Sequence, residues 1–201
     1  MATLKPSNAN GSVRERIIGA AYGLFSAHGV AQVGIDTILA KSGCAKASLY
    51  NNFDSKSELA IAFLDRRAAL WTHAWLENEV RRLAKTPRGR LLAIFDVFDS
   101  WFQRKDFEGC SFINVLLESK PDDPVRRAAT EHLAAIRSIV AGFAREEGLA
   151  NAERFAQVWH MIMKGCIVAA GEGNRSAGRQ AKEAARILVD NWKRTPKSER
   201  R

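Results

Sequence analysis

The stretch SGCAKASLYNNFDSKSEL, which runs from Ser42 to Leu59, decides the fold of this 201-residue chain. Gly43 predicts a tight turn between two short helices, one at about 35–41 and one at about 46–51. Two such helices, packed against a first helix and followed by a fourth, form a helix-turn-helix arrangement. Apolar residues can bury one side of the pair; they are Ile35, Ile38, Leu39, Leu49 and Phe53. The opposite side is therefore polar.

The polar side chains of this stretch suit contact with double-stranded DNA. Lysine donates to a guanine edge or to phosphate, asparagine can pair with adenine, and small hydroxyl groups reach either. A tyrosine hydroxyl can bond a phosphate oxygen while its ring stays packed, and a lysine in the first turn of a helix adds charge where backbone amides already favour anions. The candidates are Lys46, Ser48, Tyr50, Asn51, Asn52 and Lys56. Spacing alone leaves open that they are ordinary solvated residues of a small helical bundle.

Charge and composition narrow the class of protein. The formal net charge of +9 favours a polyanionic partner, because clustered Lys and Arg displace counterions from nucleic acid. The first residues lack the apolar core of a signal peptide and no run of eighteen apolar residues occurs, so we expect a cytoplasmic protein without a membrane span. Cys44, Cys110 and Cys166 form no CxxC pair, so we expect reduced thiols and neither a metal nor a cofactor.

The rest of the chain predicts an all-α fold of about nine helices. Apolar residues recur at spacings of three and four between the prolines, and capping boxes at Ser12 with Glu15 and at Ser55 with Glu58 mark two helix starts. Asp123 before Pro124 marks a third start. We expect the later helices at about 56–82, 91–104, within 107–118, from 124 to before 148, at 152–170 and at 176–192.

Residues 14–59 resemble the TetR family of bacterial transcriptional regulators. RERIIGAAYGLFSAHG is similar to the first helix of that family, and IDTILAKSGCAKASLYNNFDSKSEL is similar to its second to fourth helices. The resemblance implies a homodimer that binds a palindromic operator and leaves it when a small-molecule effector binds, with repression as the usual mode. It places Lys46 and Ser48 at bases or backbone, and Tyr50, Asn52 and Lys56 mainly at phosphate. Asp36 and Thr37 would lie at the groove edge.

The resemblance also implies a domain plan. We expect a flexible tail at 1–11, a helix-turn-helix DNA-binding domain at 12–55, a helical effector-binding and dimerisation domain at 56–193, and a basic tail at 194–201. Three positions depart from the family pattern: Gly34 replaces a capping Ser or Thr, and Ala45 and Ala47 replace the more usual Ser and Gly around Lys46. The base contacts are therefore left open, whereas helix-turn-helix docking is not.

An effector pocket needs an apolar lining with a few polar groups. The candidates for the lining are Trp71, Trp75, Phe95, Phe98, Trp101, Phe102, Phe112, Trp159 and Met163, with Asn114, His132 or His160 as polar groups. Plain core packing is the alternative for each aromatic residue. The chain's five tryptophans and ten phenylalanines would suit an apolar or aromatic effector, and the basic residues of the region would equally suit an anion.

The three cysteines have different expected roles. Cys110 follows Gly109 at the expected start of a helix, where amide dipoles can lower the pKa of a thiol, so we include it as a candidate sensor of oxidants or electrophiles. The alternative is a small residue buried at a helix start. Cys166 lies in an apolar stretch and is expected to be inert, and Cys44 is expected to pack in the turn.

The last two helices are the expected dimer interface. Their stripes would build a four-helix interface from two copies, with the alternative that they pack only within the subunit. The candidates are Phe155, Val158 and Ile162 on one helix and Ala181, Ala184, Ala185, Leu188 and Trp192 on the other.

Other classes of function fit the sequence less well. No HExxH, GxSxG or P-loop motif is present, and the four histidines have no metal-ligand spacing, which argues against an enzyme. A basic protein of the membrane surface would need a broad exposed apolar face opposite its charges. A DNA-binding protein without a small-molecule effector, nucleoid-associated or partner-recruiting, is the main alternative.

Overall fold

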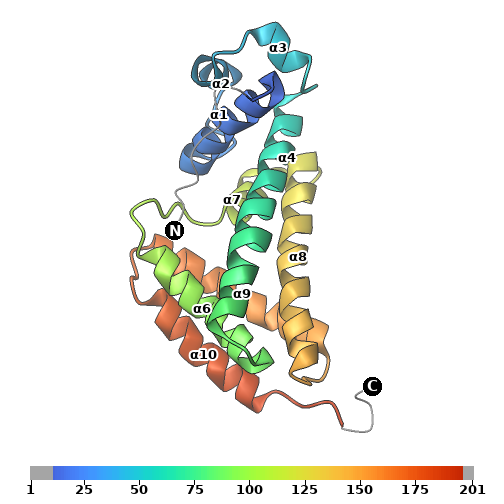
Figure 1. Cartoon of the computed structure of the whole chain (residues 1–201), viewed down its shortest axis with the longest axis vertical. Helices are drawn as coiled ribbons and strands as arrows, with labels where there is room; N and C mark the ends of the chain where they lie inside the picture. The colour runs from blue at the N-terminus through green and yellow to red at the C-terminus, as the bar shows by residue number, and fades with distance from the viewer. Residues whose placement is uncertain (1–10, 197–201) are drawn as a thin grey trace. The chain divides into compact units, whose positions relative to one another are not determined.

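The regular structure of the chain is helical, as the apolar spacing predicts (Figure 1). The structure is a computed structural model and describes residues 11–196. Its elements are α1 (Val13–His28), α2 (Ile35–Ser42), α3 (Lys46–Tyr50), α4 (Lys56–Arg67), the π-helix η1 (Ala68–Glu77), α5 (Asn78–Leu83), α6 (Pro87–Phe102), α7 (Ser111–Glu118), α8 (Pro124–Glu146), α9 (Ala152–Gly171) and α10 (Ala177–Asn191). Because α4, η1 and α5 follow one another without a break, the described residues form nine separate helices.

The described chain divides into two compact units. Unit 1 comprises residues 11–68 and 111–132, and unit 2 comprises residues 69–110 and 133–196. This division differs from the expected boundary at residue 56, because α4 packs against α1 and α7 packs against α4. The expected tails at 1–11 and 194–201 lie mostly outside the described residues.

Unit 1 is built around α1, which packs against α2, α3 and α4. Ser12 caps α1 by accepting a hydrogen bond from the backbone N of Glu15 at 3.3 Å, as the capping box predicts. The carboxylate of Glu15 pairs instead with Arg66 of α4. In the core, the rings of Phe25 and Phe63 meet edge to face with centroids 5.5 Å apart. These contacts join α4 to α1.

The helix expected at 56–82 is present with nearly these bounds, but it changes from α-helix to π-helix and back along its length. It begins at Lys56, where Ser55 accepts from the backbone N of Glu58 at 3.2 Å, and it ends at Leu83. Its middle ten residues form the π-helix η1. A wider π turn and an α turn place apolar residues at similar spacings, so periodicity cannot separate the two.

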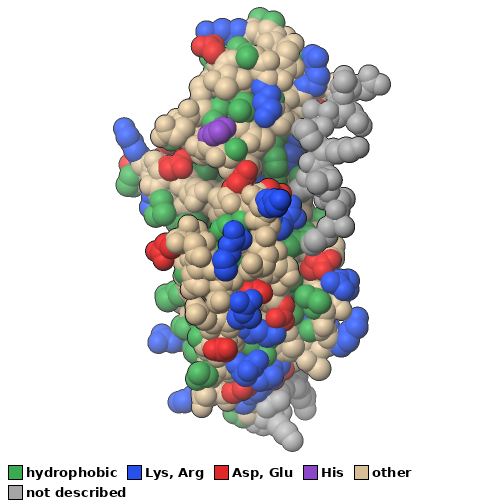
Figure 2. Space-filling model, turned by 90° about the vertical axis from the view of Figure 1, so that its left-hand side faces the viewer, with side chains coloured by type: hydrophobic (Ala, Val, Ile, Leu, Met, Phe, Trp, Pro, Cys, Tyr) green, Lys and Arg blue, Asp and Glu red, His purple; other side chains and the backbone are tan. Residues whose placement is uncertain are grey.

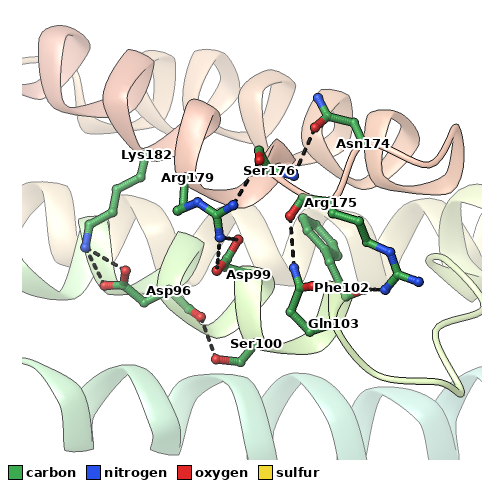
Figure 3. Close-up of polar contacts among 10 residues, drawn as sticks. All are labelled: Asp96, Asp99, Ser100, Phe102, Gln103, Asn174, Arg175, Ser176, Arg179 and Lys182. Carbon is green, nitrogen blue, oxygen red and sulfur yellow. Dashed lines mark hydrogen bonds and ion pairs between the residues drawn. The ribbon is translucent and has the colours of Figure 1, made fainter.

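Unit 2 is centred on α6, which packs against α5, α9 and α10 and is buried nearly all round, as its sequence predicts. It begins earlier than expected, at Pro87, because Thr86 accepts from the backbone N of Gly89 at 3.1 Å. Figure 3 shows the polar contacts along the seam between α6 and α10. Lys182 pairs with Asp96 at 2.6 Å and Arg179 with Asp99 at 3.2 Å.

The segment after α10 is held in unit 2. Arg194 forms an antiparallel bridge with Leu149 and pairs with Glu147 at 2.6 Å, and the backbone N of Thr195 donates to Gly148 at 2.9 Å. These residues therefore do not belong to a free tail, although the sequence placed the tail from residue 194. Within residues 11–196, no helix has both the length and the apolar character that crossing a bilayer requires.

Candidate nucleic-acid interface

The turn between α2 and α3 depends on a glycine. Gly43 has φ 63°, a left-handed conformation that favours glycine, and its backbone N donates to Leu39 O at 3.0 Å to close α2. The two helices are anchored by Ile38 and Leu49, which are fully buried, and by Phe53 after α3. Neither Gly34 nor Ala45 supplies a side-chain cap, so the apolar anchors hold the pair.

The free side of α3 presents the residues that the sequence singled out. Lys46, Tyr50 and Asn51 are exposed, and Ser48 is half-buried. Tyr50 as a residue is 48% exposed, so the expectation that its ring stays packed is corrected. Asp36 and Thr37 are exposed in the first turn of α2.

Two of the expected contact residues are already engaged within unit 1. The side-chain amide N of Asn52 donates to the backbone O of Ser48 at 2.8 Å. The side-chain oxygen of Asn52 takes no part in this bond. The ammonium of Lys56 donates to Ala31 O at 3.4 Å, in the loop between α1 and α2. On the same residue, the backbone N of Ala31 donates to Glu118 of α7 at 3.4 Å. Lys56 and Glu118 therefore hold one loop residue from both sides.

Arg14 is a candidate that the sequence analysis did not include. It is exposed, and its guanidinium lies 5.0 Å from the centre of the Phe53 ring, directly after α3. This cation–π contact holds a positive charge near the C-terminal end of α3. An arginine in the first turn of α1 gave no local signal, because the contact joins residues far apart in sequence.

Basic side chains do not by themselves mark one interface. On the face drawn in Figure 2, Lys and Arg side chains are interspersed with Asp and Glu. Several basic residues are also neutralised by ion pairs, such as Arg66 with Glu15 in unit 1 and Arg88 with Asp190 in unit 2. The assignment of a DNA-facing side therefore depends on α3 and not on net charge.

The expected pocket residues are divided between the two units. Phe112, Asn114 and His132 belong to unit 1, and the others belong to unit 2. In unit 1 the rings of Phe112 and His132 have centroids 5.1 Å apart, and His132 Nε2 lies 3.0 Å from the carboxylate of Asp65. Asn114 is exposed.

In unit 2, most of the expected lining is packed core. The buried members are Phe95, Phe98, Trp101, Phe102, Trp159 and Met163. The ring centroids of Phe95 and Trp159 are 5.4 Å apart. The ring centroid of Trp71 lies 4.7 Å from that of Trp75 and 4.4 Å from that of Trp101. A cavity in unit 2 has a volume of about 10 Å³. Of the residues expected to line an effector pocket, it includes Met163 and none of the others. Its lining consists of Leu76, Glu77, Val80, Ile94, Ile136, Ile139, Val140, Phe143 and Met163. Such a space is no larger than a single water molecule needs.

The ionisable groups of the region are in contrasting environments. His160 is 3% exposed, and its burial, together with the positive charges of Lys164 and Arg137, lowers its pKa to about 3. Burial raises the pKa of the Cys166 thiol to about 12, in agreement with the inert role expected for it.

Cys110 is half-buried directly before α7, and Cys44 is buried in the turn after α2. In the part of the chain that the structure describes, no group of three or more His, Cys, Asp or Glu side chains is placed to hold a metal ion.

The expected dimer stripe is corrected by the packing of unit 2. Phe155, Ala181 and Ala185 are buried, and Trp192 packs on Phe155 at 5.2 Å and donates to Ala150 O at 2.7 Å. Val158, Ile162 and Leu188 are half-buried and Ala184 is exposed. The outward apolar residues of these two helices are instead Met161 and Val168 on α9 and Ile187 on α10. A stripe of small residues at helical spacing cannot reveal which of two faces meets the subunit's own core.

The sequence of the helix-turn-helix region is similar to sequences of bacterial regulatory proteins. The family model of bacterial regulatory proteins of the tetR family matches residues 17–63, which include α2, α3 and most of α1 and α4. A helix-turn-helix-type transcriptional regulator encoded in the lacX 3′ region of Lactococcus lactis subsp. lactis is 27% identical over 123 residues, 61% of this chain. The matched part spans 62% of that relative.

Solved structures extend the similarity to nearly the whole chain. A TetR-type transcriptional regulator from Streptomyces avermitilis is 27% identical with a TM-score of 0.78, and the match covers 90% of this chain and 97% of that one. A TetR-family regulator from Streptomyces coelicolor has the same TM-score at 23% identity, with 89% and 95% of the two chains covered. At this level of identity, the similarity to the Streptomyces coelicolor protein shows a shared fold.

Proposed function

Because this chain belongs to the TetR family of bacterial regulatory proteins, a family of regulators and not of enzymes, we propose that it is a cytoplasmic transcriptional regulator. It binds double-stranded operator DNA through α3 and acts as a homodimer. It represses transcription while it is bound to a palindromic operator, and a small-molecule effector releases it.

The observation that carries the DNA-binding proposal is the side of α3 that Lys46, Tyr50 and Asn51 expose. A short helix of this kind fits the major groove, where lysine and asparagine can read base edges and a tyrosine hydroxyl can reach phosphate. Arg14, held over Phe53, adds a charge that suits a neighbouring phosphate. Ser48, Asn52, Lys56, Asp36 and Thr37 remain in the proposed contact set.

Two copies are needed to read successive major grooves. Recognition helices of a two-fold dimer must lie about 34–36 Å apart, or a multiple of one helical turn. We assign the dimer contact to the outward residues Met161, Val168 and Ile187, together with four members of the expected set that are not buried, Val158, Ile162, Ala184 and Leu188. A two-fold interface of this kind pairs one patch with itself.

The continuous helix from Lys56 to Leu83 is the proposed route of regulation. Its first residue donates to the loop between α1 and α2, and its later residues line the cavity of unit 2. An effector that binds one helix geometry better than another shifts the population toward it and lowers operator affinity by that difference. Equal operator affinity with and without every bound effector would exclude this mechanism.

The first test is selection of bound sequences from a random DNA pool with the purified full chain at a fixed, moderate salt concentration. Enrichment of a two-fold symmetric site is expected for a dimeric, sequence-specific regulator. Salt must be fixed because phosphate contacts make affinity strongly dependent on it. Binding without any enriched motif would contradict the proposal and favour a non-specific DNA-binding protein.

Dense packing in unit 2 favours one second candidate, a DNA-binding protein that has no effector. The cavity leaves only about 10 Å³, and the aromatic residues around α6 pack against one another. This candidate keeps the role of α3 and assigns unit 2 to dimerisation or to recruitment of a partner. A search for ligands that bind unit 2 separates the two candidates.

A further inference from the structure

Unit 2 contains buried polar atoms that nothing in the described structure pairs. Four of them are Thr72 Oγ1 and Trp75 Nε1 on η1, and Trp159 Nε1 and His160 Nδ1 on α9. Buried polar atoms in folded proteins are nearly always hydrogen-bonded, because an unpaired group loses its bonds to water. Four unpaired atoms on two helices therefore indicate that a partner binds there.

Three of the four unpaired atoms belong to residues that lie about one helical turn from residues lining the cavity. Leu76 on η1 lines that cavity and follows Thr72 by four residues. Met163 on α9 also lines it and follows Trp159 by four residues and His160 by three. Residues three and four apart share a helix face. Thr72, Trp159 and His160 thus share helix faces with the residues that line the cavity between η1 and α9.

The chemistry of these atoms points to a ligand that accepts hydrogen bonds. An indole N–H can only donate, and a hydroxyl or a neutral imidazole can also donate. His160 is neutral at physiological pH, since burial lowers its pKa to about 3. Up to three donors, from Thr72, Trp159 and His160, can therefore meet the acceptor atoms of a ligand.

Two cations add a preference for negative charge. The charges of Lys164, one turn after His160, and of Arg137 on α8 both act on the imidazole. Both side chains are half-buried, and neither forms an ion pair or a hydrogen bond with residues 11–196. The nearby cavity residue Glu77 does not neutralise them, because its carboxylate pairs with Arg81 at 2.9 Å. A half-buried cation without a counter-ion is stabilised by an anionic ligand.

We propose that unit 2 binds an amphipathic organic anion, with a carboxylate held by Arg137, Lys164 and the donor of His160, and an apolar chain that enters the cavity beside Met163. This inference names the chemical class of the effector and, as a statement about an effector, rests on the proposed function. The cavity must widen to admit the chain. Met163, an unbranched side chain with several rotatable bonds, is suited to move aside.

Binding is measured on the purified full chain by tryptophan fluorescence and by the midpoint of thermal unfolding. The probes are straight-chain carboxylates from butanoate to dodecanoate, each below its micelle concentration, with the alcohol and the amine of the same chain length as controls. At least one carboxylate is expected to bind about tenfold or more tightly than its matched alcohol and amine, because charged hydrogen bonds are the stronger ones. If no carboxylate binds more tightly than its matched alcohol, the proposal is overturned.

A double variant, Arg137→Gln with Lys164→Gln, tests the assigned site. It is expected to weaken carboxylate binding by about tenfold or more while alcohol binding stays unchanged. The matched control is Lys85→Gln with Lys105→Gln, which removes the same charge from exposed positions of unit 2 and is expected to bind as the wild type does. Equal binding by the double variant and this control contradicts the assignment. If the double variant does not fold, carboxylate binding by the single variant Lys164→Gln is compared with that of the control in the same way, and equal binding contradicts the assignment.

Operator affinity is measured in parallel, so that two failures can be told apart. Carboxylate binding with unchanged operator affinity keeps the anion site and removes the proposed effector-controlled release. Operator binding with no preference for any carboxylate removes the anion site and keeps the DNA-binding function.

Discussion

His160 gives the clearest prediction for a single residue. Its folded-state pKa of about 3 lies below the ordinary value of 6.5, owing to burial and to the charges of Lys164 and Arg137. The unfolded chain therefore binds a proton that the folded chain does not, and stability is lost as pH falls from about 6.5 toward about 3. From this group alone, the free energy of unfolding should be roughly 2 kcal/mol smaller at pH 5 than at pH 7. Urea unfolding of wild type and His160→Leu at both pH values checks this; the variant should lose that part of the decrease, and an equal decrease in both would refute it.

The exposed side of α3 gives a second prediction at this scale. Lys46→Ala should cost about 1–3 kcal/mol of operator binding and change the preferred sequence, since a lysine can read a guanine edge. Tyr50→Phe removes one hydroxyl and should weaken binding to all sequences alike, by about 0.5–1.5 kcal/mol. Lys56→Ala should also act on all sequences, partly through the lost bond to Ala31. Binding of a fixed panel of operator variants measures both quantities, and an equal loss of preference from all three substitutions would contradict these roles.

At the scale of elements, the seam between α6 and α10 depends on a glycine. A Cβ at Gly178 would lie 2.8 Å from the Cα and 2.9 Å from the backbone N of Asp99, so the helices approach too closely for alanine. Gly178→Ala should lower the free energy of unfolding by about 1–3 kcal/mol, as overpacking does. The matched control is Gly142→Ala in α8, where no atom lies within 4 Å; it should raise stability by about 0.5–1 kcal/mol. Denaturant unfolding of both variants tests this, and stabilisation by both would show that α10 can move away from α6.

Local chemistry explains which elements the sequence could predict. The starts of α1, α4 and α8 depend on bonds between residues two or three apart, such as the backbone N of Val125 with Asp123 at 2.8 Å, and all three were predicted. The π turns of η1, the membership of α7 in unit 1 and the burial of Phe155 depend on packing between distant segments. The exposure of Lys46 followed from its helix face, whereas the bond from Asn52 to Ser48 required the rotamer of a side chain.

At the scale of the molecule, unit 2 presents an apolar stripe that no residue of the described chain covers. Met161 is 64% exposed, Val168 is 50% exposed and Ile187 is 67% exposed. Single exposed apolar residues are ordinary, but Met161, Gly165 and Val168 follow one another at helical spacing on α9, and Ala184 and Ile187 do so on α10. The small residues leave room for close approach of a second helix. These features suit the self-complementary patch of the proposed homodimer.

The dimer proposal predicts the effect of charge on this stripe. Met161→Asp with Ile187→Asp should convert the dimer to a monomer, because each interface would bury unpaired carboxylates. Light scattering after size-exclusion chromatography should show the mass of one chain, and affinity for a two-fold operator should fall because each half-site is then bound independently. Leu117→Asp is the matched control, since Leu117 is 76% exposed on α7 of unit 1 and lies outside the proposed interface. It should stay dimeric, so a double variant that also stays dimeric would move the interface to another surface, while dissociation by Leu117→Asp would place α7 in it.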